Sequence, residues 1–268
     1  MKDRLSFFLF ACLLAGVTFG GISVDPSTGW SVVDRSGHVF DANTSANPYP
    51  GLIIHGDSTV SAKTMLADCG SGQHRQTLAL APDPGDTATV TINSKATLGN
   101  ATAGQRGLFF VGENGGWGSF RLYSSVLQFY ELRVCENAAV PDADANGDAP
   151  VVLTVGQNGS APTVNMHFIA NENARPVRVV FDGGSIFHRD GGSGGWFYPN
   201  KGDIVVEAKN GNPIKMQSGG HSLDGLGIGG HTLHIKGDGA LVWDGSNDNG
   251  NGGQLKIDST TSNGCTYD

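Results

Sequence analysis

The chain has 268 residues and a formal net charge of −8 at pH 7, which argues against nucleic acid as a partner, because nucleic acid needs clustered Lys and Arg. Glycine contributes 41 residues, about double the usual share of roughly 7%, and hydrophobic residues make up only 38%. Such a composition suits short strands that surround a narrow core and are joined by tight turns. Disorder is the alternative, and the many β-branched runs argue against it.

Residues 1–20 have the pattern of a secretory signal peptide. Lys2 and Arg4 form a basic start, Leu5–Val17 is apolar, and Thr18–Gly20 places small residues at a cleavage site. The apolar run is shorter than the roughly 20 residues of a membrane span, although a retained N-terminal anchor is the alternative. No later segment is apolar enough to cross a membrane, so we expect a secreted, extracellular or cell-surface protein.

Three cysteines remain after cleavage: Cys69, Cys135 and Cys265. Export allows a disulfide, and an odd number leaves one thiol over. The sequence does not indicate which two would pair, and buried free thiols fit it equally well.

Residues 21–140 are expected to form a less regular β region. The longest apolar-rich run without Gly or Pro is 120–134, whose period of two predicts two strands bent near Ser124 and Ser125, with a helix as the alternative. Earlier strand-like runs occur at Leu52–His55, Ala88–Ile92 and Gly107–Val111.

An acidic, turn-rich linker follows at residues 141–150. Its oxygen-bearing side chains alternate as they do at the start of a calcium loop, although the twelfth position is Leu153 instead of the bidentate Glu. We therefore weigh a weak Ca²⁺ site against a solvated linker, and we expect no other cofactor. The candidate ligands are Asp142, Asp144, Asn146 and Asp148.

Residues 151–268 contain a repeat. The strand starts Val151, Val177 and Asp203 are each separated by 26 residues, and glycine pairs and polar turns follow the strands. A fixed period of roughly 20–50 residues marks a repeat architecture, and a unit made only of strands indicates a stacked β-solenoid. We therefore predict an all-β chain that forms a parallel β-helix.

The end of this region resembles the autotransporter-associated β-strand repeat. The unit of that family is G-x-G-x-L-x-L-x-G-x-N, followed by a glycine pair and another short strand. The matching positions are Gly237, Gly239, Leu241, Gly245, Asn247 and the pair Gly252 and Gly253, with Trp243 in place of the second leucine. The resemblance implies a right-handed β-helix passenger region that is exported and then displayed or released.

Three aromatic residues in or beside glycine-rich loops are the candidate ligand-binding residues: Trp117, Trp196 and Tyr198. An exposed ring can stack on the face of a sugar, although such rings can equally cap the ends of a narrow core. The expected partners are therefore cell-surface or extracellular glycans, or further copies of the chain through an exposed end strand.

Catalysis would need paired carboxylates. Asp182, Asp190, Asp203 and Glu207 lie on or beside adjacent predicted strands and could meet as in a glycoside hydrolase, but the signature motifs of β-helix hydrolases are absent. We name no catalytic residue. His231 and His234 are expected on opposite faces of one strand, where they would not share a metal.

We therefore predict a structural, adhesive or surface-interaction role rather than an enzyme. The alternative is a small carbohydrate-active β-helix enzyme or a carbohydrate-binding module. Two carboxylates that meet in a groove beside a basic residue would favour the enzyme, whereas a smooth face of Ser, Thr, Asn and Gly would favour adhesion.

Overall fold

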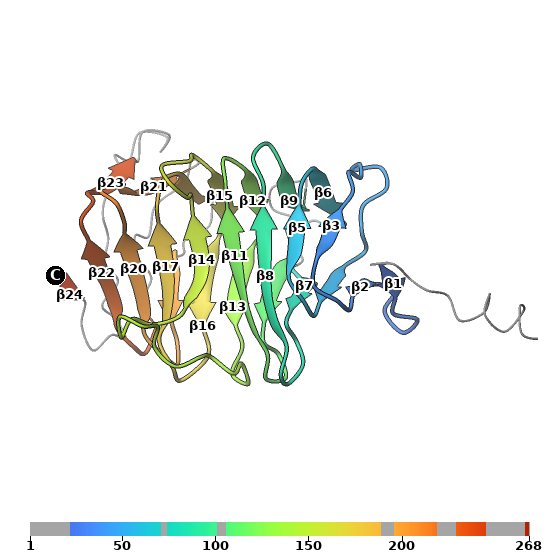
Figure 1. Cartoon of the computed structure of the whole chain (residues 1–268), viewed down its shortest axis with the longest axis horizontal. Coiled ribbons are helices and arrows are strands. Elements are labelled where there is room, and N and C mark those ends of the chain that lie inside the picture. The colour runs from blue at the N-terminus through green and yellow to red at the C-terminus, as the bar shows by residue number, and fades with distance from the viewer. Residues whose placement is uncertain are drawn as a thin grey trace, which may run out of the picture.

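The computed structural model describes residues 22–70, 74–100, 106–188, 196–218, 229–244 and 266–267. Within these ranges the chain coils around one long axis, and its strands stack into three sheets (Figure 1). The described residues contain strands and turns and no helix. The predictions of an all-β chain and of a parallel β-helix are both confirmed.

The three sheets are named A, B and C here, and their strands are given in spatial order. Sheet A contains β1 (Ser23–Val24), β2 (Ser31–Val33), β4 (Leu52–Ile54), β7 (Gln76–Leu80), β10 (Leu108–Val111), β13 (Glu131–Val134), β16 (Phe168–Asn171) and β19 (Phe197–Pro199). Sheet B contains β3 (His38–Phe40), β5 (Ser58–Val60), β8 (Thr87–Ile92), β11 (Trp117–Leu122), β14 (Val151–Val155), β17 (Val177–Phe181), β20 (Ile204–Ala208), β22 (Leu233–Gly237) and β24 (Thr266–Tyr267). Sheet C contains β6 (Lys63–Leu66), β9 (Thr97–Asn100), β12 (Val126–Gln128), β15 (Thr163–Met166), β18 (Ser185–His188), β21 (Ile214–Ser218) and β23 (Leu241–Asp244).

The predicted repeat corresponds to one coil of the β-helix, that is, one strand from each sheet. β14, β17 and β20, which begin at or next to the three predicted starts, are parallel neighbours in sheet B. β22 continues the series beside β20. The described strands pair in parallel except β1, which runs antiparallel to β2 at the N-terminal end of sheet A.

The run 120–134 crosses all three sheets, since it lies within β11, β12 and β13. The predicted break near Ser124 and Ser125 is confirmed, and the helix alternative is wrong. A second break at Phe129 and Tyr130, which the sequence analysis missed, separates β12 from β13. The acidic segment 141–150 connects β13 to β14, so the same three sheets continue on both sides of it.

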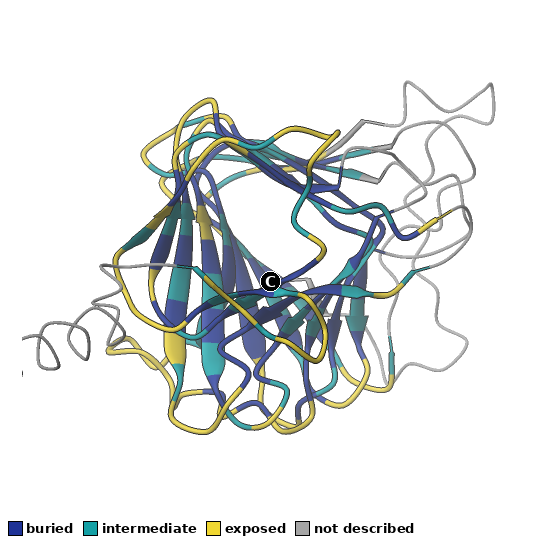
Figure 2. Cartoon of the chain, turned by 90° about the vertical axis from the view of Figure 1, so that its right-hand side faces the viewer, coloured by how far each residue is buried: buried dark blue, intermediate teal, exposed yellow. Residues whose placement is uncertain are grey.

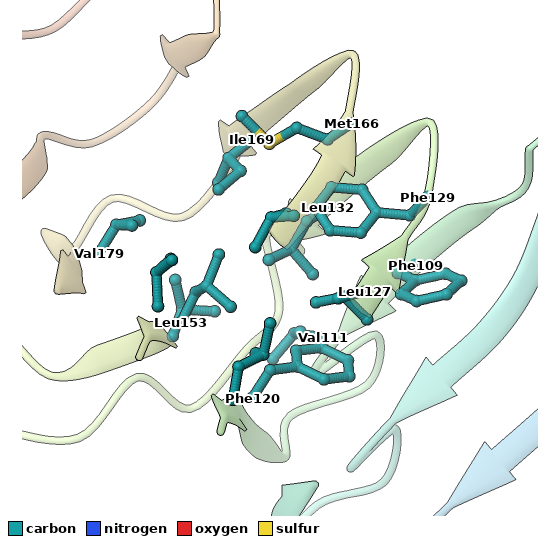
Figure 3. Packing of buried hydrophobic residues seen from close by; sticks show 14 of the residues in the cluster. Phe109, Val111, Phe120, Leu127, Phe129, Leu132, Leu153, Met166, Ile169 and Val179 are labelled. Carbon is teal, nitrogen blue, oxygen red and sulfur yellow. The ribbon is translucent and has the colours of Figure 1, made fainter. Parts of the chain in front are cut away.

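Alternation along each strand sends every second side chain into the axial core. Apolar residues from the three sheets meet there, as Phe109, Phe120 and Phe129 of a single coil do, and the core continues through the neighbouring coils (Figure 3). The ring centroids of Phe109 and Phe120 are 6.0 Å apart, and those of Phe109 and Phe129 are 5.4 Å apart. Full burial of one such side chain contributes about 1.5–3 kcal/mol, so every coil adds to the stability of its neighbours.

Buried asparagines hold the corner between sheets A and B. Asn173 Nδ2 donates to the carbonyl oxygens of Cys135, Glu136 and Ala138 at 3.2, 3.0 and 2.8 Å. These carbonyls lie in a turn beyond the strand ladders, and the amide satisfies them where burial would otherwise be costly. Viewed along the axis, the exposed residues lie mainly in such turns, outside the buried walls (Figure 2).

Candidate functional site

The outer face of sheet B carries an unbroken row of outward positions. Strands in a sheet lie about 4.8 Å apart, so eight aligned positions extend over roughly 34 Å. The row is rich in threonine toward the N-terminus and charged toward the C-terminus. In strand order it consists of Val39, Thr59, Thr91, Arg121, Thr154, Val180, Glu207 and Lys236.

The acidic segment 141–150, called the strap from here on, is tied to the outer face of sheet B. Asp144 Oδ2 accepts a hydrogen bond from Arg178 Nη2 of β17 at 2.8 Å. Asp148 Oδ1 accepts one from Lys236 Nζ of β22 at 2.5 Å. Asp144 Oδ1 also accepts the backbone N–H groups of Asn146 and Asp148, at 2.9 and 3.0 Å, and so closes the turn of the strap.

Arg178 is the centre of this charged cluster. Its side chain is only 6% exposed, and besides Asp144 it contacts Glu207 Oε2 at 2.6 Å and Asp148 Oδ2 at 3.2 Å through Nη1. Three carboxylates thus compensate one buried guanidinium, as a buried charge requires. Its Nε atom, however, is buried without a hydrogen-bond partner in the described structure.

The carboxylates of the strap are held in their ionised form. Backbone N–H groups of Asn146 and Asp148, followed by the Arg178 side chain, keep the pKa of Asp144 below its usual value. The hydrogen bond from Lys236 does the same for the pKa of Asp148. Groups with lowered pKa values do not hold the proton that the acid of a hydrolase must donate near neutral pH.

A hollow of about 360 Å³, called the polar hollow from here on, lies on the face of sheet B and is lined in part by Arg178. Its lining combines basic, amide and hydroxyl side chains. Gln157 Oε1 is buried there without a hydrogen-bond partner in the described structure. Other lining residues are Ser119, Arg121, Thr154, Asp182, Lys209 and Asn210.

A second hollow of about 320 Å³ is lined by the strap and by β22, including Asp148, Asp203, His234 and Lys236. His234 Nε2 lies 3.3 Å from Asp203 Oδ2, and His231 Nδ1 lies 3.8 Å from Asp203 Oδ1. Both histidines thus approach the same carboxylate, although they and Asp203 do not form a three-ligand metal group within the described residues. Since β22 begins at Leu233, strand alternation does not extend back to His231.

Each carboxylate of the predicted calcium loop faces a basic side chain. Asp142 Oδ1 lies 2.9 Å from Arg175 Nη1, while Asp144 and Asp148 contact Arg178 and Lys236. A calcium ion bound to these oxygens would have to replace those cations. Asn146 takes part in the turn through its backbone N–H.

The described residues contain one group that could hold a metal ion in the manner of a three-ligand site: His55, Asp83 and Asp86, whose ligand atoms all lie within 4.8 Å of one another. His55 Nδ1 is 2.7 Å from Asp86 Oδ2 and 3.8 Å from Asp83 Oδ2. The sequence gives no local sign of this group, because His55 and Asp86 are 31 residues apart and meet only through stacking of neighbouring coils.

The three candidate aromatic residues occupy different environments. Trp196 is 1% exposed and belongs to the core, and Trp117 is partly buried and packs against the core. Tyr198 of β19 lies edge-on to Phe168, with ring centroids 4.9 Å apart. The burial of Trp196 favours the packing role for this ring over stacking on a sugar.

Among the carboxyl groups of the described residues, that of Glu131 on β13 has a pKa raised above its usual value. Burial is the main cause, and it is partly offset by Arg133, whose Nε lies 2.6 Å from Glu131 Oε1. This site lies on sheet A, where Phe168 of β16 is the register partner of Glu131.

Cys69 and Cys135 are buried free thiols, and burial raises the pKa of Cys135 to about 12.

Several features predicted from the sequence fall on residues that are not described. They are the signal peptide 1–20, Asp190, Cys265 and the second half of the glycine-rich motif, from Gly245 onward.

Comparison with protein-family models, with curated proteins and with solved structures finds no match to this chain. The class that the fold defines is therefore architectural: a parallel β-helix of three stacked sheets. Among the described residues, no helix has the length and hydrophobicity that crossing a membrane would need.

Proposed function

We propose that this chain is an exported β-solenoid with a surface-interaction role, and that it binds an extended glycan across the outer face of sheet B. The observation that carries the proposal is the unbroken row of outward positions from Val39 to Lys236. A row of this length supports contact with a polymer that lies along the axis, crossing successive strands.

The chemistry of the row agrees with a sugar ligand. Thr59, Thr91 and Thr154 offer hydroxyl groups that both donate and accept hydrogen bonds, as sugar hydroxyls do.

The carboxylates beside Arg178 do converge near a basic residue, which is one expectation for an enzyme. They are ion-paired, however, and Asp144 and Asp148 have lowered pKa values, so this cluster supports binding rather than acid catalysis.

The test is a glycan-array screen of the secreted protein, followed by calorimetry with the best ligand. Thr154→Leu in the row should weaken binding at least tenfold, because it removes a hydroxyl group and the larger side chain fills the floor of the face without adding charge. Thr163→Leu is the matched control, since Thr163 is a partly buried threonine on sheet C. Absence of binding to any glycan, or equal loss in both variants, would contradict the proposal.

A second candidate function, a carbohydrate hydrolase, is favoured by the raised pKa of Glu131, a buried carboxyl group whose register partner on the neighbouring strand is Phe168. In that case the protein would release reducing sugars from the glycan that it binds, and Glu131→Gln would abolish the release while binding persists. Binding without any turnover would exclude this candidate.

A further inference from the structure

We infer that the polar hollow is a subsite for a carboxylate-bearing sugar, that is, for a uronic acid unit of an acidic polysaccharide. The inference rests on the proposed glycan-binding function and deepens it by naming the class of sugar. Three observations carry it: unpaired cations, unsatisfied buried polar atoms, and the dimensions of the hollow.

The first observation is a local excess of positive charge in a chain whose net charge is −8. Arg121 and Lys209 are exposed at the hollow, and neither forms an ion pair within the described structure. The carboxylate that lines the hollow, that of Asp182, is fully engaged. Its Oδ1 accepts hydrogen bonds from Asn210 Nδ2 at 2.9 Å and Asn212 Nδ2 at 3.0 Å, and its Oδ2 accepts one from a backbone N–H at 3.0 Å.

The second observation is a pair of buried polar atoms without partners. Arg178, a residue 5% exposed, leaves the donor Nε unsatisfied, and Gln157 leaves the acceptor Oε1 unsatisfied. Both residues line the hollow. An unmade hydrogen bond of a buried group costs about 1–3 kcal/mol, so the side chains that line the hollow keep unused hydrogen-bonding capacity, which a small shift of either side chain would turn toward a ligand that carries hydroxyl groups.

The third observation concerns dimensions. A volume of about 360 Å³ is in the range of small-molecule sites and accommodates a sugar ring. Arg121 lies on β11 and Lys209 directly follows β20, with β14 and β17 between them, which places the two cations roughly 14 Å apart. A polysaccharide that crosses these strands therefore passes both cations, and each can form charge-assisted hydrogen bonds with a sugar carboxylate.

The experiment compares three oligosaccharides of equal length by calorimetry: an oligohexuronate, its fully methyl-esterified form and the corresponding neutral oligohexose. The oligohexuronate should bind at least tenfold more tightly than the other two, and added salt should weaken its binding. The double variant Arg121→Gln with Lys209→Gln should remove this preference. Lys215→Gln is the control, because Lys215 is an exposed lysine on sheet C without an ion pair in the described structure.

The outcomes separate the inference from the proposed function. Equal binding of the acidic and esterified oligosaccharides, with Thr154→Leu still disruptive, would overturn the uronate subsite and leave the glycan-binding face in place. A polyphosphate that binds as tightly as the oligohexuronate would also overturn it, because recognition would then be of charge alone. Failure of all three oligosaccharides, and of every glycan on the array, would overturn the proposed function itself.

Discussion

Arg178 shows how much a single side chain can contribute to the stability of this fold. A guanidinium that is almost fully buried persists in the outer layer of sheet B because three carboxylates from the strap and from β20 surround it. A neighbouring arginine, Arg175, pairs with a carboxylate whose side chain is 93% exposed. The two arginines therefore contribute very differently to the free energy of unfolding, although they are three residues apart in sequence.

Arg178→Met is expected to lower the free energy of unfolding by about 3 kcal/mol, because it leaves Asp144, Asp148 and Glu207 close together without a cation. Arg175→Met should cost at most about 1 kcal/mol, as exposed ion pairs do. Urea unfolding monitored by circular dichroism measures both. Equal losses in the two variants would show that the cluster is not a buried unit.

The pH dependence of stability follows from the strap. Asp144 and Asp148 have folded-state pKa values below the usual value of about 4, so their contribution is full above that pH and disappears as the pH falls through the folded-state values. The melting temperature of the wild type should therefore drop between pH 5 and pH 3. Asp144→Asn should melt lower at pH 5 and show a shallower drop, and an unchanged profile would contradict this assignment.

At the scale of elements, the turns restrict the choice of amino acid more strictly than the strands do. Gly183 lies between β17 and β18 with φ of +125°, and a Cβ atom there would lie 2.1 Å from the carbonyl oxygen of Ser160 on the neighbouring coil. Gly159 has φ of +75° but open space around its missing Cβ. Stacking, rather than the turn alone, thus selects glycine at position 183.

Gly183→Ala should therefore destabilise the protein by about 3 kcal/mol, from backbone strain and from the clash between coils. Gly159→Ala should cost only about 1 kcal/mol, the price of a left-handed conformation for alanine. Urea unfolding of the two variants under the same conditions measures the difference. A small effect at Gly183 would show that adjacent coils can move apart there.

The strands were largely predictable from the sequence, and the site was not. β14, β17 and β20 are short β-branched runs bounded by turn residues, so local pattern and period predict both their existence and their stacking. The partners in the site come from different coils: Asp148 and Lys236 are 88 residues apart. Such contacts depend on the register between coils and on the path of the strap, and local composition predicts neither of them.

At the scale of the whole molecule, a β-helix has ends. In the described chain, β1 runs antiparallel beside β2 at the N-terminal end of sheet A, whereas β3 is the end strand of sheet B. Val39 of β3 is 51% exposed. End strands with unpaired backbone groups favour pairing with another copy.

We therefore expect self-association that increases with protein concentration in light-scattering measurements. Val39→Lys should shift the equilibrium toward the monomer, because a charged side chain on an end strand opposes pairing. A mass that stays monomeric over the whole accessible concentration range would contradict this expectation.

The strap also affects how the molecule comes apart. In a stack of coils that each contact only their neighbours, opening can begin at either end and proceed coil by coil. The bonds from the strap to β17 and β22 join coils that are not adjacent, so the coil that contains β22 cannot open without breaking the link between Asp148 and Lys236. Amide hydrogens of β14, β17, β20 and β22 should consequently exchange with solvent in one shared step, as a single cooperative unit.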